Sequence, residues 1–330
     1  MKMKMKVMFI AVGMLLSAFA LCWALGSVQS SSDVDIEIAK QGCRLAASAL
    51  RSEQGKMTAL VTSRTSDGGT QTVRAEYDIS RSGQRFLLSS ASTVIDVSMP
   101  SGADPDQYVK PGEVIHKALS FDGQTATRLM LDLNIANISA PDSTNGRAVV
   151  NEYGDEVGLP PYGIVDIGNL DQHIWHTQGY IGNGPTIVGK ESVNGNDCTI
   201  VEMVWTNGSH SGMTLTETWR FWIDPARGYT VPKIRKWKQG GRYSGKTLVE
   251  EMDTELRQHA NDVWAPSKVV HKSYRLDKDT AQPYLKQSKT MTYSADFGVN
   301  ASVSDADLKL ILPSGTKVHN ELLDADYTVP

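Results

Sequence analysis

The chain has 330 residues, a formal net charge of −4, and ordinary fractions of hydrophobic (40%) and charged (21%) residues. This composition excludes a disordered chain, and the length is sufficient to bury a large core without disulfide bonds or metal ions. The acidic balance excludes the basic face that nucleic-acid binding requires, so we expect no nucleic-acid partner.

The first 26 residues have the three parts of a secretory signal peptide. Three lysines precede an apolar run at residues 7–16, and small residues follow, so cleavage after residue 20 or after residue 26 fits the sequence. Removing the segment takes away its three lysines and changes the formal charge from −4 to −7. We therefore predict that residues 1–26 are a signal peptide and that the protein is exported to the periplasm. An N-terminal membrane anchor is the alternative, because the apolar run extends to residue 25.

Two cysteines, Cys43 and Cys198, lie outside this segment. An oxidising compartment permits a disulfide bond between them, and two separate buried thiols are the open alternative. Two cysteines without a C-x-x-C pair do not predict a zinc site, so we expect neither a metal nor a cofactor.

The first elements change from a helical period to a strand period. Apolar residues at helical spacing predict a helix between Val34 and about Gly55, interrupted at Gly42. Residues 57–64 and 72–80 then alternate between apolar and polar, with an Asp-Gly turn between them. This pattern predicts a hairpin with one buried and one solvent-exposed face.

The middle of the chain has the weakest pattern. A third strand is expected around residues 85–89, and residues 100–168 predict an irregular insertion. Within it, a turn at residues 121–124 separates two short strands. Residues 134–168 are rich in Pro, Gly and Asn, which is typical of a functional loop, a lid or a plug.

The last third is the most regular part. Residues 213–297 predict five successive strands joined by short turns, which is a meander. Strands of about ten residues in one curved sheet favour a barrel or half-barrel over a small sandwich.

The sequence contains no recognisable catalytic motif. No G-x-S-x-G elbow, P-loop or dinucleotide fingerprint occurs, so we expect no enzymatic activity. Glu217 shares the strand parity of Leu215 and Trp219, which places a carboxylate on an apolar face. It is either a polar group inside a cavity or a residue that a bulge or sheet edge turns outward.

Several turn-and-strand segments resemble a known family. They are residues 188–195, 198–201, 221–229, 263–266 and 312–318. These segments are similar to the LolA/LolB-like superfamily of bacterial lipoprotein and lipid carriers, in particular to divergent exported members labelled outer-membrane lipoprotein-sorting proteins. The resemblance implies a mainly β domain over residues 27–330. In it, a curved antiparallel sheet forms an incomplete barrel around short helices, leaving a cavity for acyl chains.

The resemblance favours a non-enzymatic periplasmic carrier or binder of lipid or lipoprotein acyl chains. Expected partners are a lipid or a lipidated protein, with an envelope membrane protein as a further candidate. The alternative is an envelope sensor or protein-interaction module of the same fold, with contacts at residues 134–168 and Trp222. The residues that we expect to line the cavity are Met213, Leu215, Glu217, Trp219, Phe221, Met252, Leu256, Met291, Tyr293 and Phe297.

Overall fold

The structure is a computed structural model that describes residues 31–65, 68–100, 110–157, 180–207, 214–277 and 279–330. The predicted signal peptide, the second part of the predicted loop at residues 134–168, and Met213 lie outside these ranges. None of the helices in the described ranges is long and apolar enough to cross a membrane.

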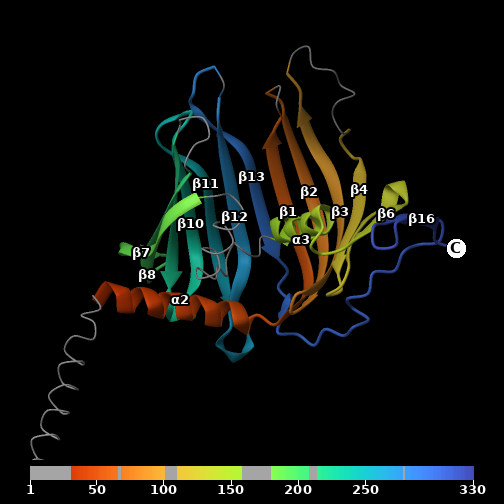
Figure 1. The fold of residues 1–330 in the computed structure, drawn as a ribbon, viewed down its shortest axis with the longest axis horizontal. Helices are drawn as coiled ribbons and strands as arrows, with labels where there is room; N and C mark the ends of the chain where they lie inside the picture. Colours follow the sequence, from red (N-terminus) through yellow and green to blue (C-terminus); the bar gives the residue numbers. More distant parts are fainter. Residues whose placement is uncertain (1–30, 66–67, 101–109, 158–179, 208–213, 278) are drawn as a thin grey trace, which may run out of the picture.

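One curved sheet contains all sixteen strands of the described residues (Figure 1). The strands are β1 (Ser52–Arg64), β2 (Thr70–Ser82), β3 (Arg85–Ser98), β4 (Val114–Phe121), β5 (Ala126–Met130), β6 (Ile135–Ser139), β7 (Tyr180–Val193), β8 (Asn196–Asn207), β9 (Leu215–Asp224), β10 (Thr230–Gly240), β11 (Tyr243–Gln258), β12 (Trp264–Leu276), β13 (Pro283–Tyr293), β14 (Gly298–Val299), β15 (Lys317–Asn320) and β16 (Ala325–Thr328). The helices are α2 (Ser31–Ala49) and α3 (Thr144–Val157), with short 3-10 turns η2 (Leu131–Leu133), η3 (Pro225–Arg227) and η4 (Ala260–Asp262).

The sheet is antiparallel except at one pair and does not close. Its order is β16-β15-β6-β5-β4-β3-β2-β1-β13-β12-β11-β10-β9-β8-β7, with β14 beside β1, and β15 runs parallel to β6. The pairing of β1 with β13 joins the first hairpin to the C-terminal meander. The predicted fold class, a curved antiparallel sheet that forms an incomplete barrel around helices, is confirmed, as are the first hairpin and the five-strand meander.

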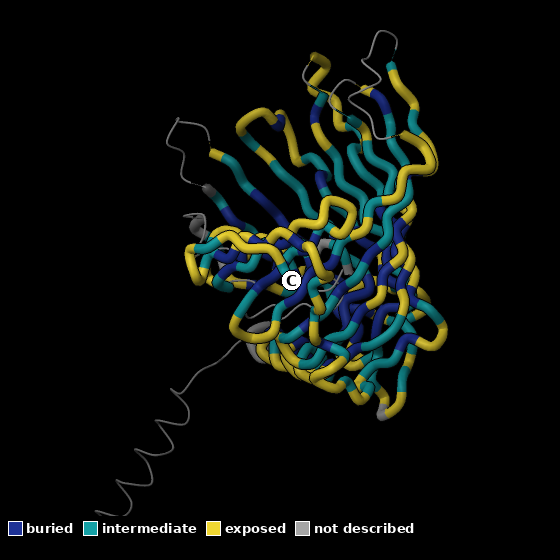
Figure 2. Tube along the Cα trace, turned by 90° about the vertical axis from the view of Figure 1, so that its right-hand side faces the viewer, coloured by how far each residue is buried: buried dark blue, intermediate teal, exposed yellow. Residues whose placement is uncertain are grey.

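The two helices lie on the concave side of the sheet, α2 along its lower end and α3 across β4, β5 and β6 (Figure 1). Strand β2 shows why the sheet has one dry face: Ala75, Tyr77 and Ile79 are buried, while Glu76 and Asp78 between them are exposed. Buried segments gather in the lower half of the molecule in Figure 2, where the concave face meets the helices. The main core is therefore enclosed between the sheet and α2 and α3.

Gly42 does not interrupt α2, which continues to Ala49 and ends before Gly55, because β1 already begins at Ser52. The glycine instead allows the ring of Tyr229 to pack against the helix, since a Cβ atom at position 42 would lie 2.2 Å from Cγ of that ring.

Replacing Gly42 with alanine should therefore destabilise the protein by about 1–3 kcal/mol through overpacking. In a solvent-exposed helix the same change would stabilise by about 1 kcal/mol, so the sign is diagnostic. Chemical denaturation measures the difference, with Gly245→Ala as control, because no atom lies within 4 Å of a Cβ atom at that position. A neutral or stabilising Gly42→Ala would contradict the packing of Tyr229 on α2.

Within the expected insertion at residues 100–168, the two short strands expected on either side of the turn are present as β4 and β5. The expected loop that starts at residue 134 differs, because its described residues contain β6 and α3. The Asn-Gly pair that suggested a turn lies in the first turn of α3, where the Ser143 hydroxyl accepts a hydrogen bond from the Gly146 amide (3.0 Å). Gly146 is required there because a Cβ atom would lie 1.9 Å from the carbonyl oxygen of Ala140. Close approach of two backbones, and not a turn, explains this glycine.

Candidate functional site

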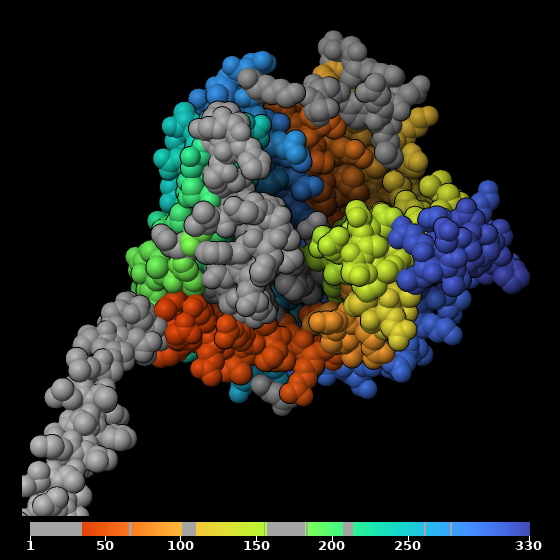
Figure 3. All heavy atoms as spheres, viewed as in Figure 1, coloured from red at the N-terminus to blue at the C-terminus, as the bar shows by residue number. Residues whose placement is uncertain are grey.

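A cleft opens on the concave side between α3 and strands β3, β4 and β5. It has a volume of about 480 Å³, and its walls are formed by Ser92, Ile115, Lys117, Arg128, Met130 and Glu152. This volume lies within the range of about 300–1,000 Å³ that is usual for ligand sites. In the space-filling view of Figure 3, the surface is hollowed between α3 and the strands above it.

The strands supply five of the six lining residues because of their register. Ser92 lies opposite Ile115, and Lys117 lies opposite Met130, so side chains of β3, β4 and β5 share the concave face. Ile115 and Met130 provide the apolar part of the wall. Lys117 and Arg128 each lie two residues away along the same two strands.

Helix α3 presents a divided inner face. Val149 and Tyr153 are buried in the main core, and the Tyr153 ring stacks on Phe86 with 3.9 Å between ring centroids. Glu152 and Glu156, one turn apart, point instead toward the cations of β4, β5 and β13. The apolar pair attaches α3 to the core, and the acidic pair attaches it to the charged groups beside the cleft.

Glu152 bridges both cleft cations. One of its carboxylate oxygens lies 2.8 Å from Nζ of Lys117, and the other accepts a hydrogen bond from Nη2 of Arg128. Nε of Arg128 is buried and has no hydrogen-bond partner among the described residues. The guanidinium group therefore uses only part of the two-nitrogen edge with which arginine normally binds an oxyanion.

Glu156 is the more deeply paired carboxylate. It accepts from Nζ of Lys117 (2.6 Å) and from the Tyr77 hydroxyl, and its Oε2 lies 3.5 Å from Nζ of Lys289. Lys289 also donates to the carbonyl oxygen of Glu156 in the last turn of α3 (2.9 Å), where the helix dipole favours a cation. Burial alone would raise the pKa of Glu156, but Lys289 and Lys117 outweigh it and hold the pKa below its usual value.

Most of the expected cavity residues lie in the packed core and not at the cleft. Trp219, Phe221, Met252, Met291, Tyr293 and Phe297 are buried there together. Leu215 packs on a second cluster around Tyr243, and Leu256 is half-buried. Met213 lies outside the described residues. The cleft wall is formed by a different set of residues, contributed by β3, β4, β5 and α3.

Glu217 faces inward, as its parity predicts, so the alternative of a bulge that turns it outward is wrong. It is buried, and its carboxylate lies 3.0 Å from Nζ of Lys236 and 2.7 Å from Nζ of Lys238. Burial would raise its pKa, but the two ammonium groups hold the pKa below its usual value. This carboxylate balances neighbouring lysines within the protein.

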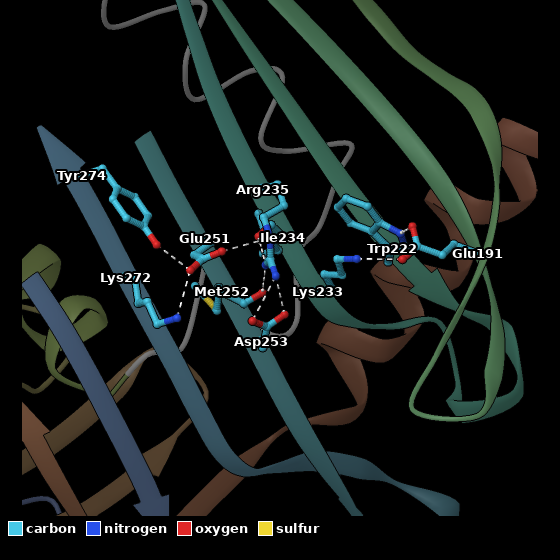
Figure 4. Close-up of polar contacts among 10 residues, drawn as sticks. All are labelled: Glu191, Trp222, Lys233, Ile234, Arg235, Glu251, Met252, Asp253, Lys272 and Tyr274. Carbon is cyan, nitrogen blue, oxygen red and sulfur yellow. Dashed lines mark hydrogen bonds and ion pairs between the residues drawn. The ribbon is translucent and has the colours of Figure 1, made fainter. Parts of the chain in front are cut away.

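The opposite face of the C-terminal meander carries a ladder of ion pairs (Figure 4). Arg235 pairs with Asp253 (2.8 Å) and lies 3.4 Å from Glu251. Trp222 is buried on this face, donates to Glu191 (2.9 Å) and has Nζ of Lys233 over its ring. Its packing leaves little of the indole available to another protein. The alternative of an interaction module with Trp222 as an exposed contact is therefore not supported at that residue.

Cys43 and Cys198 are both buried, and no disulfide bond joins them in this structure. The Cys43 thiol donates to the carbonyl oxygen of Tyr229 (3.5 Å), and the Cys198 thiol donates to that of Asn196 (3.7 Å). Burial raises the pKa of Cys198 to about 11, so this thiol is protonated at neutral pH. Within the described ranges, no group of three or more His, Cys, Asp or Glu side chains is placed to hold a metal ion.

Sequence reasoning missed the residues of the cleft. Two signals were present: Lys117 and Arg128 occupy inward positions of short strands, and Glu152 and Glu156 stand one turn apart beside Val149 and Tyr153. Neither signal identifies its partner, because the groups that meet at the cleft are far apart in the chain.

No family model matches this sequence, and neither does any curated protein. Solved structures similar to this chain include a DUF1329 family protein from Desulfovibrio piger (10% identity, 83% of this chain and 96% of that chain, TM-score 0.40). A LolA superfamily protein from Nitrosomonas europaea is similar over 82% of this chain and 97% of its own (13% identity, TM-score 0.34). An uncharacterized conserved protein from Thermus thermophilus is similar over 87% and 99% (8% identity, TM-score 0.29).

Proposed function

We propose that the protein is a non-enzymatic periplasmic binder or carrier of lipid or of lipoprotein acyl chains. The observation that carries this proposal is the open cleft of about 480 Å³ beside α3, on the concave side of an unclosed sheet. Its walls combine the apolar side chains of Ile115 and Met130 with charged groups, which suits an amphiphile. Each methylene group removed from water contributes about 0.8 kcal/mol, so even a short acyl segment gives measurable affinity.

The expected cavity residues have a defined place in this proposal. Trp219, Phe221 and Met291 belong to the same buried core as Val149 and Tyr153 of α3, and they do not line the cleft. The proposed binding site is therefore the cleft and not the packed core.

Purified protein extracted with organic solvent should release acyl species, detected by mass spectrometry, well above those from a non-binding protein. Ile115→Trp should reduce them markedly, because the larger ring occupies part of the cleft and narrows it. The control is Leu285→Trp, which adds the same ring at a residue that is 45% exposed and outside the cleft. Acyl content that is absent from the wild type, or unchanged by Ile115→Trp, would refute binding in the cleft.

A further inference from the structure

We infer that Lys117 and Arg128 form a subsite for the acidic headgroup of the bound amphiphile, and that Glu152 of α3 occupies this subsite when no ligand is present. The inference rests on the proposed function and specifies the chemical class of the ligand: an apolar chain that ends in a carboxylate or phosphate group.

Two cations stand side by side in the cleft wall. Lys117 and Arg128 both contact Glu152, and Lys117 also contacts Glu156. Cations in a partly enclosed site attract an anion more strongly than the same charges at an open surface.

Two buried polar atoms next to the cleft lack partners in the described structure. Nε of Arg128 has none, although its neighbour Nη2 binds Glu152, and Oγ of Ser90 has none, although the residue is only 7% exposed. Ser90 lies between Tyr77 and Lys117 in the sheet register, on the concave face. Unpaired buried polar atoms are rare in native proteins and call for a partner, and an oxyanion in the cleft would supply an acceptor for Nε of Arg128.

Glu152 is the carboxylate that a ligand can replace at low cost. Both of its partners line the cleft, and its side chain is 25% exposed, so it can return to water. Glu156 would keep Lys289, Lys117 and Tyr77 after such an exchange, and α3 would stay attached through Tyr153 and Val149. The exchange replaces one set of charge-assisted hydrogen bonds with another, while Arg128 gains the use of both edge nitrogens.

The test compares decanoate with 1-decanol, which share the chain length and differ in the charged head, by calorimetric titration of the folded protein. The wild type should bind decanoate about tenfold more tightly, as one charge-assisted hydrogen bond provides. Arg128→Gln should remove most of this preference, and it should lower decanoate affinity more than decanol affinity. Arg128→Lys, which keeps the charge and loses the planar edge, should remove part of it and serves if Arg128→Gln does not fold.

Glu152→Gln provides the readout that a merely structural role would not give. Removing the internal competitor should increase decanoate affinity several-fold, and this increase should exceed any change in decanol affinity. A loss of affinity for both probes would mean that Glu152 only supports the fold, and this result would overturn the inference.

The remaining outcomes separate the two proposals. Equal affinity of the wild type for both probes, unchanged by Arg128→Gln, would overturn the headgroup subsite and leave the lipid binder standing. Failure to bind either probe would overturn the lipid binder. Inorganic phosphate that binds as tightly as decyl phosphate would overturn the assignment to a headgroup, because the site would then recognise a free anion.

Discussion

Replacing Phe221 with alanine should lower the free energy of unfolding by about 3–5 kcal/mol, the usual cost of a large-to-small change of an aromatic residue in a packed core. Phe221 is fully buried on β9, and its ring stacks on Trp219 at 6.0 Å between centroids with an interplanar angle of 8°. The ring lies in the main core, so we expect the substitution to leave an empty cavity. Urea denaturation followed by circular dichroism measures the change.

The same substitution distinguishes a packed core from a ligand cavity. The sequence suggested that Phe221 lines a cavity, and in that case alanine would abolish acyl binding at a cost below about 1 kcal/mol in stability. Leu60→Ala is the matched control, because Leu60 is in the same sheet but 44% exposed, and it should cost less than about 1 kcal/mol. A small change in stability together with a loss of bound lipid would show instead that Phe221 lines a ligand cavity.

Replacing Glu156 with glutamine should destabilise the protein by about 2–3 kcal/mol, because it removes the carboxylate that lies beside the ammonium groups of Lys289 and Lys117. The side chain of Lys289 is only 10% exposed, so water can compensate for little of the lost interaction. The double variant Glu156→Gln with Lys289→Met should recover much of the loss, since an apolar side chain in place of the lysine has no charge to compensate. Glu255→Gln is the control, because Glu255 is 63% exposed in a single surface pair with Lys268 and should change stability by less than about 1 kcal/mol.

The stability of the wild type should also depend on pH through Glu156. Its folded-state pKa is lower than the ordinary value of 4.5, so the unfolded chain takes up the proton first as the pH falls. The stabilisation is fully present above about pH 4.5 and is lost as the pH falls through the folded-state pKa. Denaturation midpoints at a series of pH values should fall more steeply in the wild type than in Glu156→Gln. Parallel curves would show that Glu156 does not hold this ion pair in solution.

The strands of the sheet could be predicted from the sequence because their signal is local. Alternation at Ala75, Tyr77 and Ile79 places β2 with one face in the core, and the meander β9 to β13 follows from alternation and turn residues. Parity also placed Glu217 on the inner face. It did not reveal that Lys236 and Lys238 neutralise the carboxylate, because a strand pattern gives the direction of a side chain and not its partner.

The insertion was misread for a related reason. Asn145 and Gly146 are typical turn residues, but here they lie in the first turn of α3. Glycine is required at position 146 because the backbone at Ala140 passes too close for any side chain. The requirement for glycine comes from a contact between two segments. Residue preferences alone therefore suggested a loop where the chain forms a helix.

The sequence by itself determined that the chain is mainly β, that its strands have one apolar face, and that a helix precedes the first hairpin. Only the tertiary structure decided which faces stay packed and where a cleft remains. Helix α3 follows β6 and a turn and packs on the concave side of the sheet. It brings Glu152 to Lys117 of β4 and Arg128 of β5, and the cleft lies beside these three residues. These side chains meet through the register of the sheet and the position of one helix, and long-range contacts of this kind leave no periodic signal in the sequence.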